Sequence, residues 1–267
     1  MAQAAPETPQ PEVVRPILQL KGIGRRFGGL HAVRSVDLAV APGERRAILG
    51  PNGAGKTTLF NVISGDMTPT SGTIELFGED VTRLLARERA KLGLSRTYQT
   101  SRLFPGLTVE DNLYLAALGV EGGHFRPFVV QRRDGALRAR AREVATTVGL
   151  AARLAQPVGS LSHGEQRQLE LGMARLPNPK LMLLDEPASG LSRGERVALT
   201  DLLIQLDPAI TLIMIEHDMD VALRVAQKVT MMHDGRVIVE GTPSEIRANP
   251  VVHKLYLGSR YGAEEDG

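Results

Sequence analysis

Apolar runs and helical patterns alternate along most of this 267-residue chain. Residues 180–187 and 210–218 each contain an unbroken apolar run, which is typical of strands covered on both faces. The stretch 192–206 between them reads as a helix. Because strands joined through a helix lie parallel in one sheet, this order predicts an α/β fold with a mostly parallel sheet.

Both ends of this core carry patterns that are typical of antiparallel strands. Three short strand-like pieces, separated by Gly, Pro and Ser turns, occupy residues 17–22, 36–40 and 72–81. They predict an antiparallel β layer near the N-terminus. Residues 228–241 predict a hairpin around the turn Asp234-Gly235, and a short helix is expected to begin within 242–245.

The middle of the chain is rich in Arg and Ala and predicts an inserted α-helical subdomain. Residues 142–154 read as a helix, and residues 119–135 form a connector that contains glycine. The predicted boundaries are a disordered tail over 1–16, a core over 17–98 and 162–246, a helical subdomain over 99–161, a C-terminal helix over 243–258 and a tail over 259–267.

Composition and charge narrow the class of protein. With 42% apolar and 23% charged residues, the chain is expected to be globular. Its formal charge of +2, from 32 basic and 30 acidic residues, is too small to predict nucleic acid as a partner. The absence of cysteine excludes disulfides and thiolate metal sites and fits a reducing cytoplasm. No apolar run approaches the roughly 18 residues that span a bilayer, so we expect neither a spanning nor a secreted protein.

The sequence GPNGAGKTT fits the Walker A pattern of a phosphate-binding loop, between an apolar run and a stretch that can continue as a helix. Glycines let backbone amides curl around phosphate oxygens, Lys56 can reach the β and γ phosphates, and the Thr57 hydroxyl can hold Mg²⁺. Four specified positions in this strand-to-helix context disfavour a glycine turn that binds nothing. The candidate phosphate-binding residues are Gly50, Pro51, Asn52, Gly53, Ala54, Gly55, Lys56, Thr57 and Thr58.

An acidic pair, Asp185 and Glu186, follows the apolar run at 181–184. Parallel sheets bind ligands at the carboxyl ends of their strands. Asp185 is therefore expected to hold Mg²⁺, and Glu186 to orient and deprotonate an attacking water. A solvated acidic pair would be the commoner interpretation of these two residues alone, but the glycine loop favours the catalytic one.

Residues 162–165, with the sequence SHGE, allow two interpretations. In a capping box, Ser162 caps a helix and Glu165 reaches back to the amide of the cap; 192–195 and 242–245 have the same spacing. Alternatively, Ser162 and the first amides of that helix hold a phosphate, because a helix N-terminus offers unpaired donors and a positive dipole end. The spacing leaves both open, and one helix start can serve both purposes.

With these motifs the chain resembles the ATP-binding subunits of ABC transporters, over about residues 17 to 258. The likeness rests on GPNGAGKTT, on LSHGEQ shortly before LMLLDEP, on the glutamine of RTYQ and on IEHD after the next strand. It implies the P-loop NTPase fold of an ABC ATPase, which hydrolyses ATP with Mg²⁺. In that family LSHGEQ occupies the signature sequence, and two such subunits, identical or different, meet head to tail with ATP between the Walker A loop of one and the signature helix of the other.

The resemblance also implies roles for single residues. Ser162 would face the γ-phosphate of a partner, next to Gly164, whose lack of a side chain lets a ligand approach the amides, while Glu165 helps to order the helix start. His163 replaces a glycine and Glu165 a glutamine of the commonest signature. Ser192 stands where many members have an aspartate, so no role across the dimer is assigned to it.

Three further residues acquire roles in the same way. Gln99 would sense Mg²⁺ and water and link the nucleotide state to a membrane partner, although alone it reads as a loop glutamine. His217 would contact the γ-phosphate and help to place the water, whereas a lone histidine is more often structural. Phe27 would stack on adenine or belong to the core. The implied metal ligands are Thr57, Gln99 and Asp185.

Within the family, the stretches 25–33, 96–104, 215–220 and 241–258 are most similar to the ATPase subunits of branched-chain amino acid uptake systems. This implies a peripheral subunit on the cytoplasmic face of the inner or plasma membrane, with transmembrane permease subunits as partners and a solute-binding protein as an indirect one. Related systems carry urea, amides or aromatic acids, and a lipopolysaccharide-export ATPase has a similar C-terminal end.

Two other functions are weaker alternatives. Soluble ABC ATPases of DNA repair or ribosomes usually carry a long coiled coil or two nucleotide domains, whereas this chain has one set of motifs. A nucleotide switch without a partner's half-site would not need Glu186, His217 and Ser162.

The connector over 119–135 could dock a membrane subunit through Phe125, Phe128, Val129, Val130, Arg132 and Arg133, or be a solvated loop.

Overall fold

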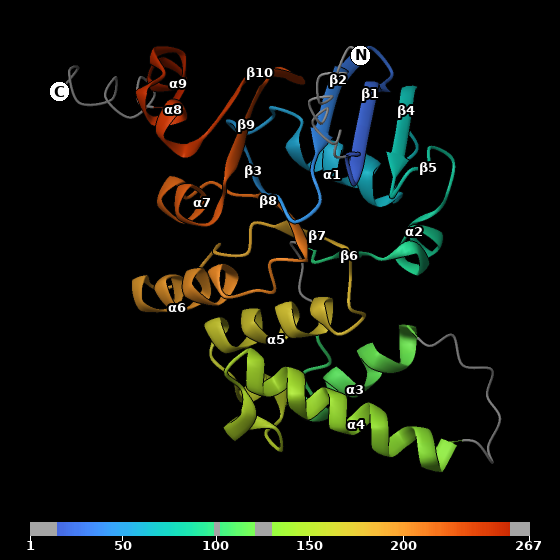
Figure 1. Ribbon diagram of the computed structural model, residues 1–267. Coiled ribbons are helices and arrows are strands. Elements are labelled where there is room, and N and C mark those ends of the chain that lie inside the picture. The colour runs from blue at the N-terminus through green and yellow to red at the C-terminus, as the bar shows by residue number, and fades with distance from the viewer. Residues whose placement is uncertain (1–14, 99–101, 121–129, 257–267) are drawn as a thin grey trace, which may run out of the picture.

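The centre of the fold is a six-stranded sheet (Figure 1) in the order β10-β9-β3-β8-β7-β6. The computed structural model describes residues 15–98, 102–120 and 130–256. The strands are β3 (Arg45–Leu49), β6 (Leu94–Arg96), β7 (Leu181–Asp185), β8 (Thr211–Ile215), β9 (Lys228–His233) and β10 (Arg236–Gly241). Neighbouring strands are parallel except β9 and β10, which form an antiparallel hairpin. The mostly parallel sheet and the hairpin at Asp234-Gly235 are confirmed.

The central strands are buried on both faces, as their unbroken apolar runs predict. Successive residues of a strand point to opposite faces, so Leu212 and Met214 of β8 join one apolar cluster while Ile213 and Ile215 join another. The first cluster is covered by helices α5 (His163–Arg175), α6 (Arg193–Ile204) and α7 (Met219–Val225). The second contains the apolar residues of α1 (Lys56–Ser64).

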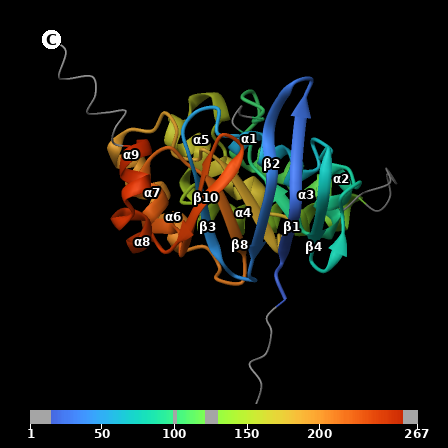
Figure 2. The same cartoon turned by 90° about the horizontal axis from the view of Figure 1, so that it is seen from above.

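A second sheet, of four strands in the order β2-β1-β4-β5, packs on the same cluster as α1 (Figure 2). Its strands are β1 (Leu18–Phe27), β2 (Leu30–Val40), β4 (Ser71–Leu76) and β5 (Glu79–Asp80). All pairs are antiparallel, which confirms the predicted layer. The piece predicted over 72–81 is two strands rather than one, because Phe77 and Gly78 form a turn with φ of 56° and 84°.

The helices α3 (Val109–Val120) and α4 (Val130–Thr147) form a third apolar cluster with α5, at the end of the molecule away from the four-stranded sheet (Figure 1). The prediction of a helix over 142–154 was wrong at the C-terminal end. Helix α4 stops at Thr147, because Gly149 takes a φ of 78°, which ends a helix. Short 3-10 turns follow at Ala151–Arg153 and Val158–Ser160. The last part of the predicted connector is helical, since α4 begins at Val130, and its residues 121–129 lie outside the described part of the chain.

The C-terminal helix predicted over 243–258 is two short helices, α8 (Pro243–Ala248) and α9 (Pro250–Tyr256). Asn249 between them is extended, with ψ of 119°, because the ring of Pro250 disfavours the helical conformation in the residue before it. A further short helix, α2 (Ala86–Leu92), precedes β6. Within the described residues no helix combines the length and apolarity needed to cross a bilayer. The predicted tails lie outside the described residues except for residues 15 and 16.

A buried arginine joins the two sheets. The side chain of Arg46 in β3 is fully buried, and its guanidinium donates to the carboxylates of Glu44 and Glu240, each at 2.6 Å. It also donates to the carbonyl oxygen of Ala39 at 2.9 Å. Because Ala39 belongs to β2 and Glu240 to β10, this one cation connects three strands of both sheets.

We expect Arg46→Ala to lower the free energy of unfolding by about 3 kcal/mol, because two carboxylates lose a buried cation. Urea denaturation measures this loss. The control is Lys21→Ala, which breaks an exposed ion pair with Glu75 and should cost less than about 1 kcal/mol. Equal losses in the two variants would contradict the structural role of Arg46.

Candidate nucleotide-binding site

The strand order brings the candidate residues to one edge of the central sheet. Strand β8 lies between β3 and β7. The parallel strands end at the same edge, so the glycine loop after β3 and the acidic pair at the end of β7 flank His217, which follows β8. The topology therefore gathers a loop of backbone amides, two carboxylates and an imidazole, as the motifs predict.

The glycine loop ends at a helix start that no side chain in the described part of the chain caps. Gly55 is the N-cap of α1, with φ of 96°, no side-chain hydrogen bond at the cap and no acidic residue in the first turn. A Cβ at this position would lie 2.3 Å from the carbonyl oxygen of Ala32, so only glycine fits. The start of α1 thus offers backbone amides and a positive dipole end to an anion.

The side chain of Lys56 is folded back onto this loop. It is only 5% exposed, and its ammonium donates to the carbonyl oxygens of Gly50 at 2.7 Å and Pro51 at 3.0 Å. Burial lowers the pKa of Lys56, against the opposing effect of the nearby carboxylates of Glu186 and Asp185. The ammonium is therefore held beside the acidic pair by two neutral acceptors, which phosphate oxygens can replace.

Asp185 is a buried carboxylate, and only one of its two oxygens has a hydrogen-bond partner among the described residues. Arg96 donates to its Oδ2 at 3.0 Å, whereas its Oδ1 is buried and has no hydrogen-bond partner among the described residues. Burial raises the pKa of Asp185, and the charge of Arg96 opposes this effect. A buried carboxylate oxygen without a donor is costly, so this atom fits a cation.

Arg96 ties Asp185 to the far end of α1. Its Nη1 donates to Asn61 at 2.7 Å, to Ser64 at 2.8 Å and to Asp66 at 3.0 Å. The guanidinium also lies over the ring of Tyr98, 4.9 Å from its centre. The helix that carries the phosphate loop and the strand that carries the acidic pair are thus joined by one cation.

Glu186 and His217 are in direct contact. The Nε2 atom of His217 lies 2.6 Å from Oε1 of Glu186. Glu186 has a φ of 50°, a conformation that costs a non-glycine residue about 1 to 2 kcal/mol. Its amide donates to the carbonyl oxygen of Ile215 at 3.0 Å, which holds the residue at the end of β8. Strain of this kind persists only where the surroundings impose it, and here it aims a carboxylate at the histidine.

Glu216 organises the loops on which this pair stands. Its buried carboxylate accepts a hydrogen bond from the amide of Ala188 at 2.8 Å, and others from His217 at 3.1 Å and Asp218 at 3.4 Å. Burial raises the pKa of Glu216 to about 7, although these backbone amides favour its charged form. One carboxyl group therefore joins the segment after Glu186 to the segment that carries His217.

A cleft of about 410 Å³ opens over the glycine loop. Phe27, which is 43% exposed, borders it, and the guanidinium of Arg25 lies 4.8 Å from the centre of the Phe27 ring. The residues that line the cleft are Phe27, Leu30, His31, Ala32, Arg34, Asn52, Gly53, Ala54, Gly55, Lys56, Thr57, Thr58, Glu186, His217 and Asp234. Most of the predicted phosphate loop, Phe27, Glu186 and His217 therefore share one cleft.

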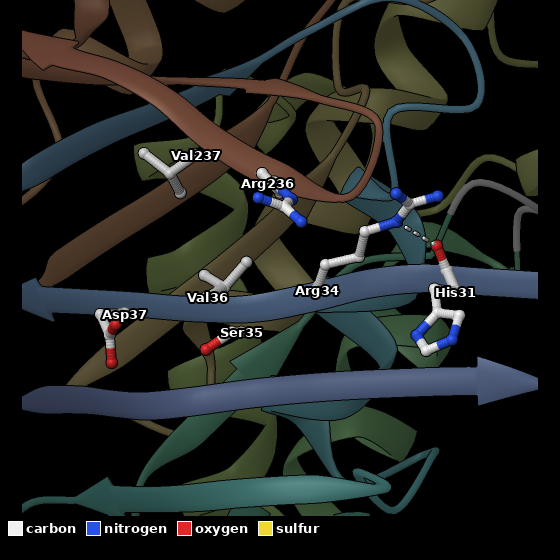
Figure 3. Close-up of a pocket in the computed structure, with 7 residues that line it drawn as sticks. All are labelled: His31, Arg34, Ser35, Val36, Asp37, Arg236 and Val237. Atoms are coloured by element: carbon white, nitrogen blue, oxygen red, sulfur yellow. Dashed lines mark hydrogen bonds between the residues drawn. The ribbon is translucent and has the colours of Figure 1, made fainter.

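A second, larger hollow of about 710 Å³ adjoins the cleft and shares His31 and Arg34 with it. Figure 3 shows it between β2, which carries Arg34, and β10, which carries Arg236. Nε of Arg34 donates to the carbonyl oxygen of His31 at 3.3 Å, the bond drawn as a dashed line. Arg34 and Arg236 outweigh the one carboxylate of this hollow, Asp37, so the lining carries an excess of positive charge, which favours the approach of anions.

The capping box at the start of α5 is confirmed. The Ser162 side chain accepts from the amide of Glu165 at 3.2 Å, and the Glu165 carboxylate accepts from the amide of Ser162 at 2.9 Å. Neither residue lines the cleft described above, nor does Gly164. His163 packs against its own chain, with Nδ1 3.3 Å from the carbonyl oxygen of Gly190. Gln99 lies outside the described residues.

Comparison with known proteins decides the family. Residues 33–189 match the family described as "ABC transporter", and residues 236–262 match one described as "Branched-chain amino acid ATP-binding cassette transporter". The chain belongs to the ABC transporter family. This ABC protein is 36% identical over 251 residues to BraF of Pseudomonas aeruginosa, named as a high-affinity branched-chain amino acid transport ATP-binding protein. The match covers 91% of this chain and 98% of BraF.

Solved ABC cassettes share the fold. The ADP conformation of the cassette MJ1267 has a TM-score of 0.80 and 28% identity, and the match covers 91% of this chain and 99% of that one. A dimeric post-hydrolysis state of the cassette MJ0796, bound to ADP and Pi, has a TM-score of 0.72 and 25% identity over 85% of this chain and 98% of that one. The predicted fold class is therefore confirmed, and the chain is an ATPase subunit of the kind that energises an ABC transporter.

Sequence reasoning missed two residues of this ABC site. Arg96 lies within a stretch that carried the resemblance, yet its contact with Asp185 joins residues 89 positions apart. Glu216 lies directly after an apolar run, as Asp185 and Glu186 do. This position at the end of a predicted strand could have identified Glu216 as a candidate site residue.

The raised pKa of Glu216 makes the stability of the protein depend on pH. Its pKa is about 7 in the folded protein and 4.5 ordinarily, so its contribution is full below pH 4.5 and is lost as the pH rises through 7. We expect the free energy of unfolding, measured with urea relative to Glu216→Gln, to fall by about 2 to 3 kcal/mol between about pH 5 and 8. A difference between the two proteins that stays constant over this range would contradict the assignment.

Proposed function

We propose that this cassette is the ATP-hydrolysing subunit of a branched-chain amino acid importer, peripheral to the cytoplasmic face of the membrane. The contact of Glu186 with His217 over the phosphate loop is the observation that carries the proposed mechanism. The match of residues 236–262 and the 36% identity to BraF support branched-chain amino acids over the other solutes that related systems carry.

ATP is expected to bind with its phosphates on the glycine loop. The amides at the start of α1 and the Lys56 ammonium would bind the β and γ phosphate oxygens, while Thr57 and Thr58 line the same cleft. Phe27 at its border would stack on adenine. Positive charge from Arg34 and Arg236 supports the approach of a triphosphate.

The residues present fit a magnesium ion. Oδ1 of Asp185, which has no partner among the described residues, and the Thr57 hydroxyl are oxygen ligands of the kind Mg²⁺ prefers, and we assign Gln99 as a third. When bound, Mg²⁺ would neutralise charge on the phosphate oxygens. No group of three His, Cys, Asp or Glu side chains gathers for a metal within the described residues, which fits an ion that takes further ligands from the nucleotide and water.

We assign the activation of water to Glu186. Its carboxylate would orient the attacking water and accept a proton from it. His217, 2.6 Å away, would hold this carboxylate in place and contact the γ-phosphate. The strained backbone of Glu186 and the three hydrogen bonds to Glu216 support a fixed geometry for both groups.

A second copy or a close relative would complete the site. Ser162, Gly164 and Glu165 do not line the cleft of their own chain. We propose that the Ser162 hydroxyl and the Gly164 amide bind the γ-phosphate on a partner, while Glu165 orders the helix start. The dimer of MJ0796 with ADP and Pi supports such pairing.

Permease subunits are the expected membrane partners, with a solute-binding protein as an indirect one. A cavity of about 220 Å³ opens beside Tyr98, which precedes Gln99 in the sequence, and is lined by Arg102, Leu103, Ala116 and Met173 among others. Its mixed polar and apolar lining suits a short permease segment, which Gln99 would link to the nucleotide.

Lys56→Ala is expected to weaken ATP binding by about tenfold or more, because a charge-assisted contact with phosphate is lost. Equilibrium titration with a fluorescent ATP analogue measures the affinity. Lys21→Ala removes a lysine that does not line the cleft and should bind ATP as the wild type does. An unchanged affinity in Lys56→Ala would undermine the phosphate-loop assignment.

Glu186→Gln should slow ATP hydrolysis by about a hundredfold or more, because the amide cannot accept a proton from water. Since ATP then persists, we expect a nucleotide-bound dimer to accumulate in size-exclusion chromatography with light scattering. A variant that remains monomeric at saturating ATP would oppose the two-copy site.

A further inference from the structure

The start of α5 is occupied by a carboxylate from the neighbouring helix. Oε1 of Glu195, in the first turn of α6, accepts hydrogen bonds from the Gly164 amide at 2.9 Å and from the Ser162 hydroxyl at 3.2 Å. These are the two donors that the proposed function assigns to the γ-phosphate of a second copy. In the single chain, both are held by an anion of the chain itself.

This contact is not a by-product of helix capping. The capping box of α6 uses the other oxygen, because Oε2 of Glu195 accepts from the amide and hydroxyl of Ser192, at 3.0 Å and 2.7 Å. Glu245 closes an equivalent box at α8 with Oε2 alone, at 2.7 Å from the amide and 3.0 Å from the hydroxyl of Thr242. Oε1 of Glu195 thus takes no part in the capping box of α6. It contacts the start of α5 instead, at Gly164, which lies 31 residues earlier in the sequence.

The carboxylate takes the space that the glycine leaves. A Cβ at Gly164 would lie 2.6 Å from Oε1 of Glu195, so the absent side chain of Gly164 already admits one anion. The hydrogen bonds from Ser192, Gly164 and Ser162 lower the pKa of Glu195 to about 2. The group is therefore ionised at neutral pH, and it can make way for a phosphate only by turning aside.

We propose that Glu195 is an intramolecular competitor of the γ-phosphate: it occupies the Ser162–Gly164 half-site in the single chain and must leave before a second copy's ATP binds there. Two anions cannot share these donors, and like charges at contact distance repel. The proposal rests on the proposed function, which brings a second copy to this surface. Glu195 then sets the ATP concentration at which two copies close, without touching the cleft that binds ATP in one copy.

The test compares two glutamate variants in the Glu186→Gln background, where ATP is not consumed. Glu195→Gln keeps the size of the side chain and the capping box, in which glutamine also serves, but removes the charge. Glu245→Gln makes the same change in a capping box without a second helix contact. Sedimentation velocity measures the fraction of dimer against the concentration of Mg-ATP.

We expect Glu195→Gln to lower the ATP concentration at half-maximal dimerisation by about tenfold, as two hydrogen bonds to a charged acceptor no longer have to be broken. The midpoint of Glu245→Gln should not move, and the affinity of the monomer for a fluorescent ATP analogue should be the same in all variants. If this ATP concentration is unchanged or higher in Glu195→Gln, the proposal that Glu195 competes with the γ-phosphate is wrong. Should that variant not fold, Glu195→Asp, whose shorter side chain withdraws from α5, carries the same expectation.

The Glu186→Gln variant without a further substitution shows whether the role of Glu195 or the whole two-copy site is wrong. If Glu186→Gln alone dimerises with ATP while Glu195→Gln shifts nothing, only the competitor is wrong. If Glu186→Gln forms no dimer at any ATP concentration, the two-copy site fails and the competitor with it. A loss of ATP affinity in monomeric Glu195→Gln would also count against the proposal, because it would place Glu195 in the first cleft.

Discussion

The site depends on charges that are buried at one edge of a parallel sheet and that the fold only partly satisfies. Lys56 and Asp185 are 5% and 2% exposed, which is costly for groups that are ionised. Among the described residues, Lys56 donates to two backbone carbonyls, and Arg96 pairs with one oxygen of Asp185 while the other oxygen has no partner. In the proposed site, a triphosphate with a cation would supply acceptors for the ammonium and a charge for the carboxylate. Part of the binding energy then comes from satisfying groups that the fold has already dehydrated.

Such charges stay in place because the strands beneath them cannot slip. Residues of β8 alternate between two apolar clusters, so a shift by one residue would exchange its apolar contacts on both faces. Arg96 joins α1 to β7, and Glu216 joins the loops after β7 and β8. The cost of holding Glu186 at a φ of 50° is therefore met by packing and hydrogen bonds outside the cleft.

Local signals allowed the sequence to predict the parallel core, the hairpin and the phosphate loop. An apolar run, a turn dipeptide or a glycine pattern each reports on its own neighbourhood. The contacts of Arg96 with Asp185 and of Glu195 with Gly164 join residues 89 and 31 positions apart, so no local pattern announces them. The break at Asn249 was different, because Pro250 was visible in the sequence and its effect on the preceding residue is local. Likewise, Gly149 marked the end of α4.

The two helix starts to which we assign phosphate binding differ in charge, and this difference predicts an order of events. The start of α1 has a glycine cap and no acidic residue in its first turn, so the helix itself places no carboxylate on its first amides. The start of α5 has two carboxylates on it, one from its own capping box and one from Glu195. An isolated chain can therefore take up nucleotide at α1 while α5 stays satisfied within the molecule. Only a phosphate already fixed on a second copy, and brought close by the rest of that surface, competes well with a carboxylate that is tethered in place. The distribution of charge therefore favours our proposal that nucleotide binds first and that two copies pair second.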